Sequence, residues 1–166
     1  MAKKKPAKTT STPEPAASRR SSRQYWLLKS EPGTWSWDDQ LHAPKRTTAW
    51  DGVRNHQANN HMKAMAVGDR AFFYHSVKAR TIVGVVEIVK AHEPDPSDAT
   101  GRGFGMVTVK AVETATNPVS LDDIKRAAAD EPELAEMVLL KQSRLSVQPV
   151  TPEQWALICD MAGLEA

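Results

Sequence analysis

The chain has 166 residues, which fits one globular domain, because chains usually divide into several domains only well above about 200 residues. Its 22 basic and 20 acidic residues are unevenly distributed: seven basic and one acidic residue fall in positions 1–24, leaving 15 basic and 19 acidic residues for positions 25–166. A globular part with a charge of −4 lacks the field of Lys and Arg that non-specific duplex binding requires.

The single cysteine, Cys159, excludes an internal disulfide and a zinc site built from several cysteines. No apolar segment approaches the roughly 20 residues that cross a bilayer, and the N-terminus lacks the apolar stretch of a secretory signal. We therefore expect a soluble protein in the cytoplasm, with no membrane partner and with association with the nucleoid as a further option.

Residues 1–23 contain no aromatic or large aliphatic residue after Met1. Such a segment cannot bury enough apolar surface to offset the loss of conformational entropy, so we predict a disordered basic tail with a charge of +6. The tail either raises the rate of encounter with nucleic acid or only keeps the protein in solution. Residues 24–166 form the predicted domain.

The first half of this domain is predicted to begin with a strand and to continue with two helices. Tyr25–Lys29 is an apolar and aromatic run that ends at a Pro-Gly turn. Ser36 and Asp39 have the spacing of a capping box, which predicts a short helix through about Leu41. A second helix is predicted over Val53–Met65. The stripe that would face the core is unusually polar: Val53, Gln57, Asn60 and Ala64 or Met65.

The second half begins with the period of strands, over Arg70–Val77, Thr81–Ala91 and Phe104–Glu113. The short link between the first two predicts an antiparallel pair. Next comes a helix that starts at a Ser120 capping box. It is followed by a further helix, from about 131 to between 137 and 140, and by a strand over 144–150. The last helix has Thr151 as its N-cap. It would turn three side chains inward: Trp155, Ile158 and Cys159.

This order of elements lacks the regular alternation of strands and helices that a doubly wound parallel sheet requires. We therefore predict an α+β fold. Its centre would be a small, curved, mostly antiparallel sheet or open barrel, with helices packed around it.

Motifs of the common catalytic frameworks are absent from the sequence, including a glycine-rich phosphate loop, G-x-S-x-G and H-E-x-x-H. His56 and His61 are five residues apart, which on a helix rotates them about 140° from each other and prevents a shared metal face. Asp51, His56 and His75 remain as the basis of a cryptic nuclease or hydrolase, but no activated serine or paired carboxylates accompany them. We expect a binding protein rather than an enzyme, with no catalytic residue, metal or cofactor.

The five tryptophans differ in their surroundings. Trp26 and Trp155 lie in patterned apolar runs, which favours core positions. Trp35 and Trp37 flank a helix start, where packing of the helix onto the sheet is the favoured interpretation. Trp50 instead lies in a polar stretch, where a large ring needs either a core slot or a ligand.

Polar groups that could accompany a ligand of Trp50 follow it closely. Gly52 permits close approach of the backbone. An aromatic face contributes about 1–3 kcal/mol by stacking on a base, and amides can then read the base edge with a donor and an acceptor. The candidate neighbours are Arg54, Asn55, Gln57, Asn59 and Asn60. The alternative is a surface helix whose amides are only solvated.

Four separated blocks, in the right order, resemble the EVE domain family: YWLLKSEP (Tyr25–Pro32), WDGVRNHQANNHMKAM (Trp50–Met65), VGD with FFYHS (67–69 and 72–76), and RLSVQPVT (Arg144–Thr151). The resemblance extends from about Tyr25 to the C-terminus and implies a PUA-like open β-barrel. EVE domains are related to YTH domains, which read methylated adenine in RNA, and to RNA-binding PUA modules. EVE members themselves are linked with modified DNA bases, especially cytosines, so the implied activity is binding.

The resemblance also implies a base-binding pocket. Lys29-Ser30 and Ala49-Trp50 fall where the YTH pattern has Lys-Ser and Val-Trp, and that Trp belongs to the YTH aromatic cage. Trp50 is therefore the first choice for the stacking platform. The residues expected to line or support the pocket with it are Lys29, Ser30, Glu31, Gly52, Val53, Arg54, Asn55, Tyr74, His75, Ser76, Arg144, Ser146 and Gln148.

Two of these residues have alternative roles. Glu31 could accept a hydrogen bond from an exocyclic amine, as carboxylates do from cytosine N4, or could form a salt bridge with Arg54 or Arg144. Gln148 is either an edge reader, which we favour, or a core amide that satisfies backbone groups. One segment of this chain departs from the family. The loop before the third strand is short and Gly-rich, and Phe104 stands where many relatives carry Trp. That loop is expected to contribute less to binding.

We expect the partner to be DNA or RNA that carries a modified or flipped base, with a modified cytosine in DNA favoured, and the protein to be a monomer. A second hypothesis is an RNA-associated or nucleoside-binding interaction module. The third is the cryptic nuclease or hydrolase.

Overall fold

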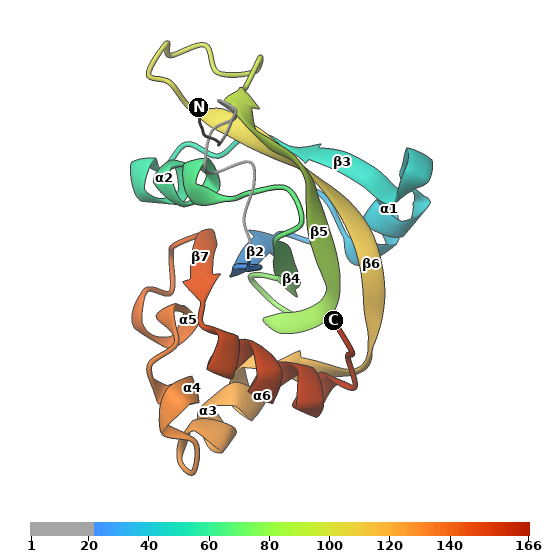
Figure 1. Cartoon of the computed structure of the whole chain (residues 1–166), viewed down its shortest axis with the longest axis vertical. Helices are drawn as coiled ribbons and strands as arrows, with labels where there is room; N and C mark the ends of the chain where they lie inside the picture. Colours follow the sequence, from blue (N-terminus) through green and yellow to red (C-terminus); the bar gives the residue numbers. More distant parts are fainter. Residues whose placement is uncertain (1–21) are drawn as a thin grey trace, which may run out of the picture.

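The computed structural model describes residues 22–166, and a six-stranded sheet with the order β3-β6-β5-β4-β2-β7 runs through them (Figure 1). The strands are β2 (Tyr25–Ser30), β3 (Thr47–Trp50), β4 (Arg70–His75), β5 (Thr81–Pro94), β6 (Gly105–Ser120) and β7 (Val147–Val150). All neighbouring strands pair antiparallel except β2 and β4. The sheet ends at β3 and β7 and is not closed, so the predicted α+β fold with an open, mostly antiparallel sheet is confirmed.

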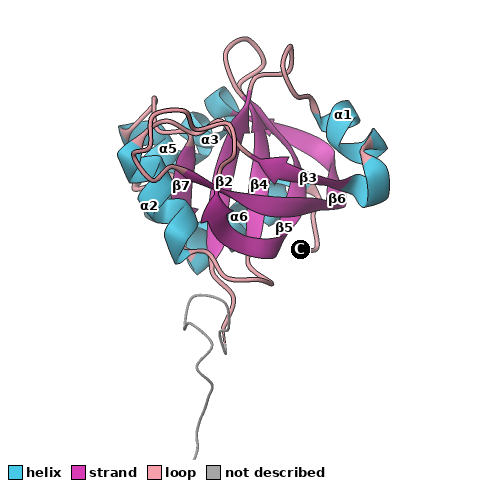
Figure 2. Ribbon diagram, turned by 90° about the horizontal axis from the view of Figure 1, so that it is seen from above, coloured by secondary structure: helices cyan, strands magenta, loops and turns pink. Residues whose placement is uncertain are grey.

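The helices lie around this sheet, and Figure 2 shows the strands between α2 on one side and α1 on the other. The helices are α1 (Trp37–His42), η2 (Pro44–Arg46), α2 (His56–Ala64), α3 (Leu121–Ala128), α4 (Pro132–Ala135), α5 (Val138–Lys141) and α6 (Pro152–Ala162). The predicted capping boxes at Ser36, Ser120 and Thr151 all form. These starts were predictable because a capping box depends only on residues three apart in the chain.

Residues 1–21 of the predicted disordered tail lie outside the described residues, so that part stays a prediction. Arg23, at the end of the same segment, donates from Nε to the carbonyl oxygen of Gly68 at 2.9 Å. The hydrogen bond places this residue against the domain.

Side chains of the central strands alternate between two hydrophobic clusters, as the two-residue period of a strand requires. On β4, Phe73 points into a cluster with Trp50 and Trp37, whereas its neighbour Phe72 points to the opposite face and stacks on Trp155 with 3.9 Å between ring centroids. Trp155 is therefore a core residue, as predicted. The first cluster lies under α1 and α2, and the second under α3 to α6.

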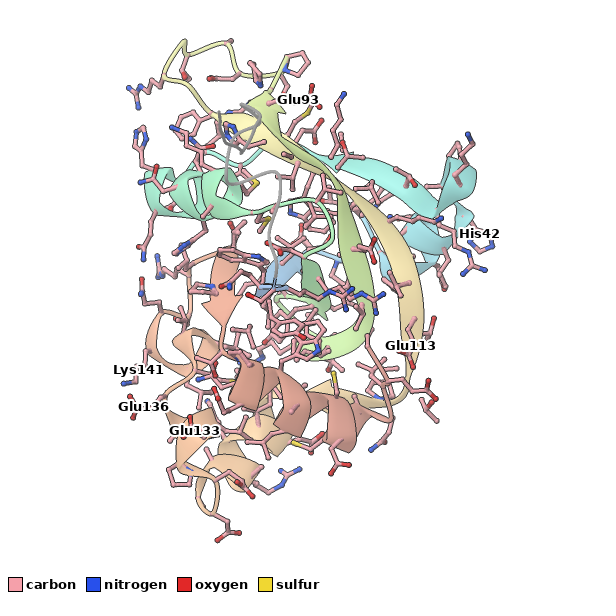
Figure 3. The ribbon with its side chains drawn as sticks, viewed as in Figure 1. His42, Glu93, Glu113, Glu133, Glu136 and Lys141 are labelled. Atoms are coloured by element: carbon pink, nitrogen blue, oxygen red, sulfur yellow. The ribbon has the colours of Figure 1, made fainter. Side chains whose placement is uncertain are left out.

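The long strands β5 and β6 are strongly curved. Their register shifts at four points along the pair, and each such irregularity adds local twist. Figure 1 shows both strands bending along the height of the molecule, past α2 at one end and α6 at the other. Glu113 of β6 also accepts hydrogen bonds from the backbone N–H groups of Glu165 and Ala166, which ties the C-terminal residues to the sheet (Figure 3).

The region between β3 and α2 differs from the prediction. Thr47–Trp50 has a polar sequence but forms the edge strand β3 by pairing with β6. The second helix begins at His56 rather than at Val53, and its buried residues are Ala58, Asn59 and Met62. The predicted polar stripe is wrong because it took its phase from Val53, which lies before the helix.

Gly84 of β5 is predicted to be essential for the packing of α1. A Cβ atom added at Gly84 would lie 2.3 Å from Cζ2 of Trp37, a buried ring that also donates from Nε1 to Thr114 Oγ1 at 3.0 Å. Gly84→Ala should lower the free energy of unfolding by about 1–3 kcal/mol, measured by urea denaturation. Gly33→Ala, where no atom lies within 4 Å of the added Cβ, is the control. Equal stability of the two variants would contradict the packing role.

Candidate functional site

A cavity of about 590 Å³, here called the first cavity, opens where β2 and β3 end beside the loop before α2. Three chain segments and one residue near β7 form its wall. The lining residues are Lys29, Ser30, Glu31, Thr34, Trp35, Thr48, Ala49, Trp50, Asp51, Gly52, Val53, Arg54 and Ser146. Eight of the fourteen predicted pocket residues are therefore gathered here.

Trp50 forms part of the wall of the first cavity rather than a freestanding platform. Only 9% of its surface is exposed, because its ring packs edge-on against Phe73 with 5.5 Å between centroids and an angle of 86°. Trp50 thus occupies a core slot and also lines the first cavity.

Trp35 is a second tryptophan in the wall of the first cavity, and the predicted pocket does not include it. It is half-buried, and its Nε1 donates to Gln40 Oε1 of α1 at 2.9 Å. The prediction that Trp35 and Trp37 pack helix α1 onto the sheet holds for Trp37, which is buried, and Trp35 packs against the same hydrophobic cluster. Trp35 precedes the N-cap of α1, and only the turn from Glu31 to Trp35 brings it beside the end of β2.

Ser30 and Glu31 have distinct roles in that turn. The Ser30 hydroxyl donates to the carbonyl oxygen of Trp35, and the Glu31 carbonyl accepts from the backbone N–H groups of Thr34 and Trp35, both at 2.9 Å. Ser30 is therefore occupied with holding the turn. The Glu31 carboxylate is exposed and accepts from Thr34 Oγ1 at 3.3 Å. Within residues 22–166, it forms no salt bridge with an arginine.

Arg54 forms its salt bridge with Asp95, at 3.1 Å, and not with Glu31. The Asp95 carboxylate is buried and also accepts from the backbone N–H of Gly52 at 2.8 Å and from the N–H and hydroxyl of Ser97 at 2.7 and 2.6 Å. Burial alone would raise the pKa of Asp95, but hydrogen bonds from Ser97, Gly52 and Arg54 outweigh it and hold this pKa well below the usual value. One carboxylate thus fixes the loop after Trp50.

Phe104 also supports the loop after Trp50, through its contact with Arg54. It is buried, it lies under the Arg54 guanidinium with 5.7 Å to the ring centroid, and it stacks on His56 with 4.8 Å between centroids. Phe104 therefore positions Arg54 from beneath. In the sequence, the only sign of a special role for Phe104 was that it departs from the family pattern.

A second cavity of about 460 Å³ shares Lys29 and Ser146 with the first. Its lining residues are Lys29, Tyr74, Ser76, Val77, Arg80, Leu121, Leu139, Ser143, Arg144 and Ser146. Three more predicted residues, Tyr74, Ser76 and Arg144, line this cavity and not the first. The predicted pocket is therefore divided between two neighbouring cavities.

Three predicted residues line neither cavity. Asn55 is the N-cap of α2, with its Oδ1 accepting from the Ala58 N–H at 2.8 Å. His75 accepts the Trp37 N–H through Nε2 at 3.0 Å, and burial lowers its pKa. Gln148 is fully buried and donates from Nε2 to the Leu145 carbonyl at 2.8 Å, while its Oε1 has no hydrogen-bond partner among the described residues. The structure thus favours the core-amide role for Gln148.

The residues suggested for a cryptic nuclease lie in different surroundings. Asp51 lines the first cavity, His56 stacks on Phe104, and His75 binds the start of α1. Within residues 22–166, no group of three or more His, Cys, Asp or Glu side chains is arranged to hold a metal ion. No helix in this part of the chain is long and apolar enough to cross a membrane.

Asp95 is predicted to stabilise the site through its negative charge. Asp95→Asn retains an acceptor oxygen but removes the charge, and should lower the free energy of unfolding at pH 7 by about 1–3 kcal/mol in urea denaturation. The folded-state pKa of Asp95 lies below the ordinary value of 3.8. The stability that the charge contributes is therefore fully present above the ordinary pKa and is lost as the pH falls through the folded-state pKa. The difference between wild type and variant should therefore shrink in acid.

The control for this experiment is Asp51→Asn, which removes an exposed carboxylate from the same loop. Asp51→Asn should leave the free energy of unfolding nearly unchanged, both at pH 7 and in acid. An equal loss in the two variants would show that the loop responds to net charge and not to the hydrogen bonds of Asp95.

Comparison with known proteins identifies the family of this chain. The sequence pattern of the EVE domain matches residues 24–161. Thymocyte nuclear protein 1 from Rattus norvegicus is 38% identical over 169 residues, which cover 85% of this chain and 74% of that protein. The human thymocyte nuclear protein 1 is 35% identical over 169 residues, with 85% and 75% covered.

Solved structures agree with this assignment. An NMR structure from Rhodopseudomonas palustris is 52% identical, with a TM-score of 0.77 over 86% of this chain and 95% of that one. Human THYN1 in complex with DNA containing 5-methylcytosine is 34% identical, with a TM-score of 0.79 over 86% and 99%. The ASCH protein from Zymomonas mobilis, at 10% identity and a TM-score of 0.53, shares the fold alone. The chain belongs to the EVE domain family.

Proposed function

We propose that this protein binds DNA by taking a single base into the first cavity, with a modified cytosine favoured. The observation that carries the proposal is the cavity itself: about 590 Å³, walled by Trp35, Trp50 and the Glu31 carboxylate, in a chain that is 34% identical to human THYN1, whose structure was solved with DNA containing 5-methylcytosine. A volume of this size is typical of sites that bind small organic groups.

The chemistry of the wall suits a flipped or unpaired base. Two tryptophans offer aromatic surface for contact with a heterocycle, and Ala49 and Val53 offer apolar groups that could contact a methyl substituent. Glu31 is exposed and has no cationic partner in the described part of the chain, so its carboxylate is available to accept from an exocyclic amine. In the same cavity, Asp51 adds a second carboxylate beside the cations Lys29 and Arg54, and Arg54 is paired with Asp95, so the wall has no excess of positive charge that would favour a phosphate over a base edge.

This arrangement supports our proposal of binding rather than catalysis. The wall presents groups that stack and form hydrogen bonds, and its main ion pair, Arg54 with Asp95, holds the loop in place. We propose that the protein acts as a monomer, that it works without a cofactor, and that the basic tail contributes to the salt-sensitive part of the affinity.

Trp50→Phe tests the aromatic wall. Trp50→Ala would remove a buried ring and cost about 3–5 kcal/mol of stability, whereas Phe keeps most of the core contact. Trp50→Phe should weaken binding to an oligonucleotide with one 5-methylcytosine by roughly threefold to tenfold, because complete loss of stacking costs about 1–3 kcal/mol per base and Phe keeps only a smaller ring. Fluorescence anisotropy with DNA and RNA, each with methylated and unmethylated cytosine, measures the effect and separates the two sugars.

The matched control is Trp155→Phe, which makes the same change in the hydrophobic cluster on the other side of the sheet. It should leave the affinity unchanged. If both variants bind like wild type, or if both lose affinity equally, the first cavity is not the base site.

Glu31→Gln tests the reading of the base edge. The glutamine amide retains an acceptor oxygen but also has an NH₂ donor. If this NH₂ group turned inward, it would meet the N4 amine of cytosine, which is also a donor. The variant should lose preference for a cytosine-type base over thymine, which has an acceptor at that position, while its binding to thymine-containing DNA stays within about twofold. Unchanged preference in competition binding would remove Glu31 from the reading role.

A further inference from the structure

The two cavities differ sharply in charge although they share a wall. Glu31 and Asp51 line the first cavity, whereas no Asp or Glu is among the residues of the described chain that line the second. The second cavity instead has three basic residues, Lys29, Arg80 and Arg144. Hydroxyl groups accompany them, on Ser76, Ser143, Ser146 and Tyr74.

Lys29 stands on the wall between the cavities and is a cation without a carboxylate partner among residues 22–166. Its Nζ donates to the carbonyl oxygen of Ser143 at 2.5 Å and lies 5.8 Å from the centroid of the Tyr74 ring. Both contacts are with neutral groups, and burial lowers the pKa of this amine. An anion beside Nζ would offset the desolvation of the charge.

Arg80 and Arg144 line the second cavity from two separate loops, before β5 and before β7. Both are exposed, and in the described part of the chain neither forms a salt bridge. Arg80 has a positive φ of 44°, and Val77 in the same turn has a φ of 70°, a conformation that β-branched residues rarely adopt. The Leu121 N–H donates to the Arg80 carbonyl at 2.8 Å and fixes the turn. Backbone strain is thus maintained where the turn meets the cavity.

We infer that the second cavity is a phosphate subsite, which holds the phosphodiester next to the base bound in the first cavity. Arg80 and Arg144 are its outer donors, and Lys29 is the donor nearest the base. The inference rests on the proposed function, because the shared wall at Lys29 and Ser146 connects the two sites. The carboxylates of the first cavity repel a phosphate, so the charges of the two cavities orient the strand.

The test combines a charge variant with chemically altered DNA. The double variant Arg80→Ala/Arg144→Ala should bind roughly tenfold more weakly to methylated and unmethylated oligonucleotides alike, with their affinity ratio unchanged. The slope of log Kd against log salt concentration should fall by about 0.7–0.9 for each phosphate that the variant no longer neutralises. The control Lys63→Ala/Lys110→Ala removes two exposed charges that line neither cavity, and should change affinity by less than about twofold.

Methylphosphonate substitution locates the phosphate without altering the protein. Replacing, one at a time, the phosphates on either side of the 5-methylcytosine should weaken wild-type binding at one position, and the same replacement should have no further effect on the double variant. Additive losses at every position would overturn the inference. Equal losses in the double variant and its control would also overturn it, as would a loss of base preference with an unchanged salt slope.

Failure of this inference is distinguishable from failure of the proposed function. If Trp50→Phe binds the 5-methylcytosine oligonucleotide as tightly as Trp155→Phe does, while the double variant has a smaller salt slope and no methylphosphonate sensitivity, the base site is wrong and the phosphate subsite stands. If Trp50→Phe binds more weakly than Trp155→Phe while the double variant matches its control, the base site stands and the phosphate subsite is wrong.

Discussion

The candidate site depends on one buried carboxylate. Asp95 accepts from the Gly52 backbone, from Ser97 and from Arg54, and so fixes the loop after Trp50 to a segment more than 40 residues later in the chain. Without this link, the loop would have few restraints between the end of β3 and the start of α2, because Gly52 has a positive φ of 80° and no side chain. The wall of the first cavity is therefore preorganised by a buried carboxylate that is not among its lining residues.

The sheet supplies the second constraint. Because side chains alternate along each strand, β2 and β4 divide their apolar residues between two clusters and leave polar groups where the strands end. Lys29 and Ser30 lie at the end of β2, beside Tyr74 and His75 of β4 in parallel register. Both cavities arise there, so the core and the candidate binding surface come from the same strands. Trp50 shows this dual role, since its ring completes the first cluster and also lines the first cavity.

Electrostatics then separates the two cavities. The globular part has an overall negative charge, which disfavours a general grip on duplex DNA. Cations line both cavities, Lys29 in each and Arg54 in the first, but among the described residues only the first cavity is also lined by carboxylates, those of Glu31 and Asp51. A globular part with a net negative charge can thus have a locally basic cavity beside one that also contains carboxylates. In our proposal, the two cavities bind the phosphodiester and the base separately.

The sequence by itself determined the capping boxes, the antiparallel strands, the core roles of Trp26 and Trp155, and the four blocks that identify the family, because these features depend on neighbouring residues or on ordered motifs. Eight of the fourteen residues that it predicts for the pocket line the first cavity, Trp50 among them. Only the tertiary structure decided that Trp35 joins the wall, that Arg54 pairs with Asp95 instead of Glu31, that Gln148 is buried, and that Arg144 belongs to a second cavity. Those contacts join residues far apart in the chain, and their partners are set by strand register and loop closure, which no local spacing records.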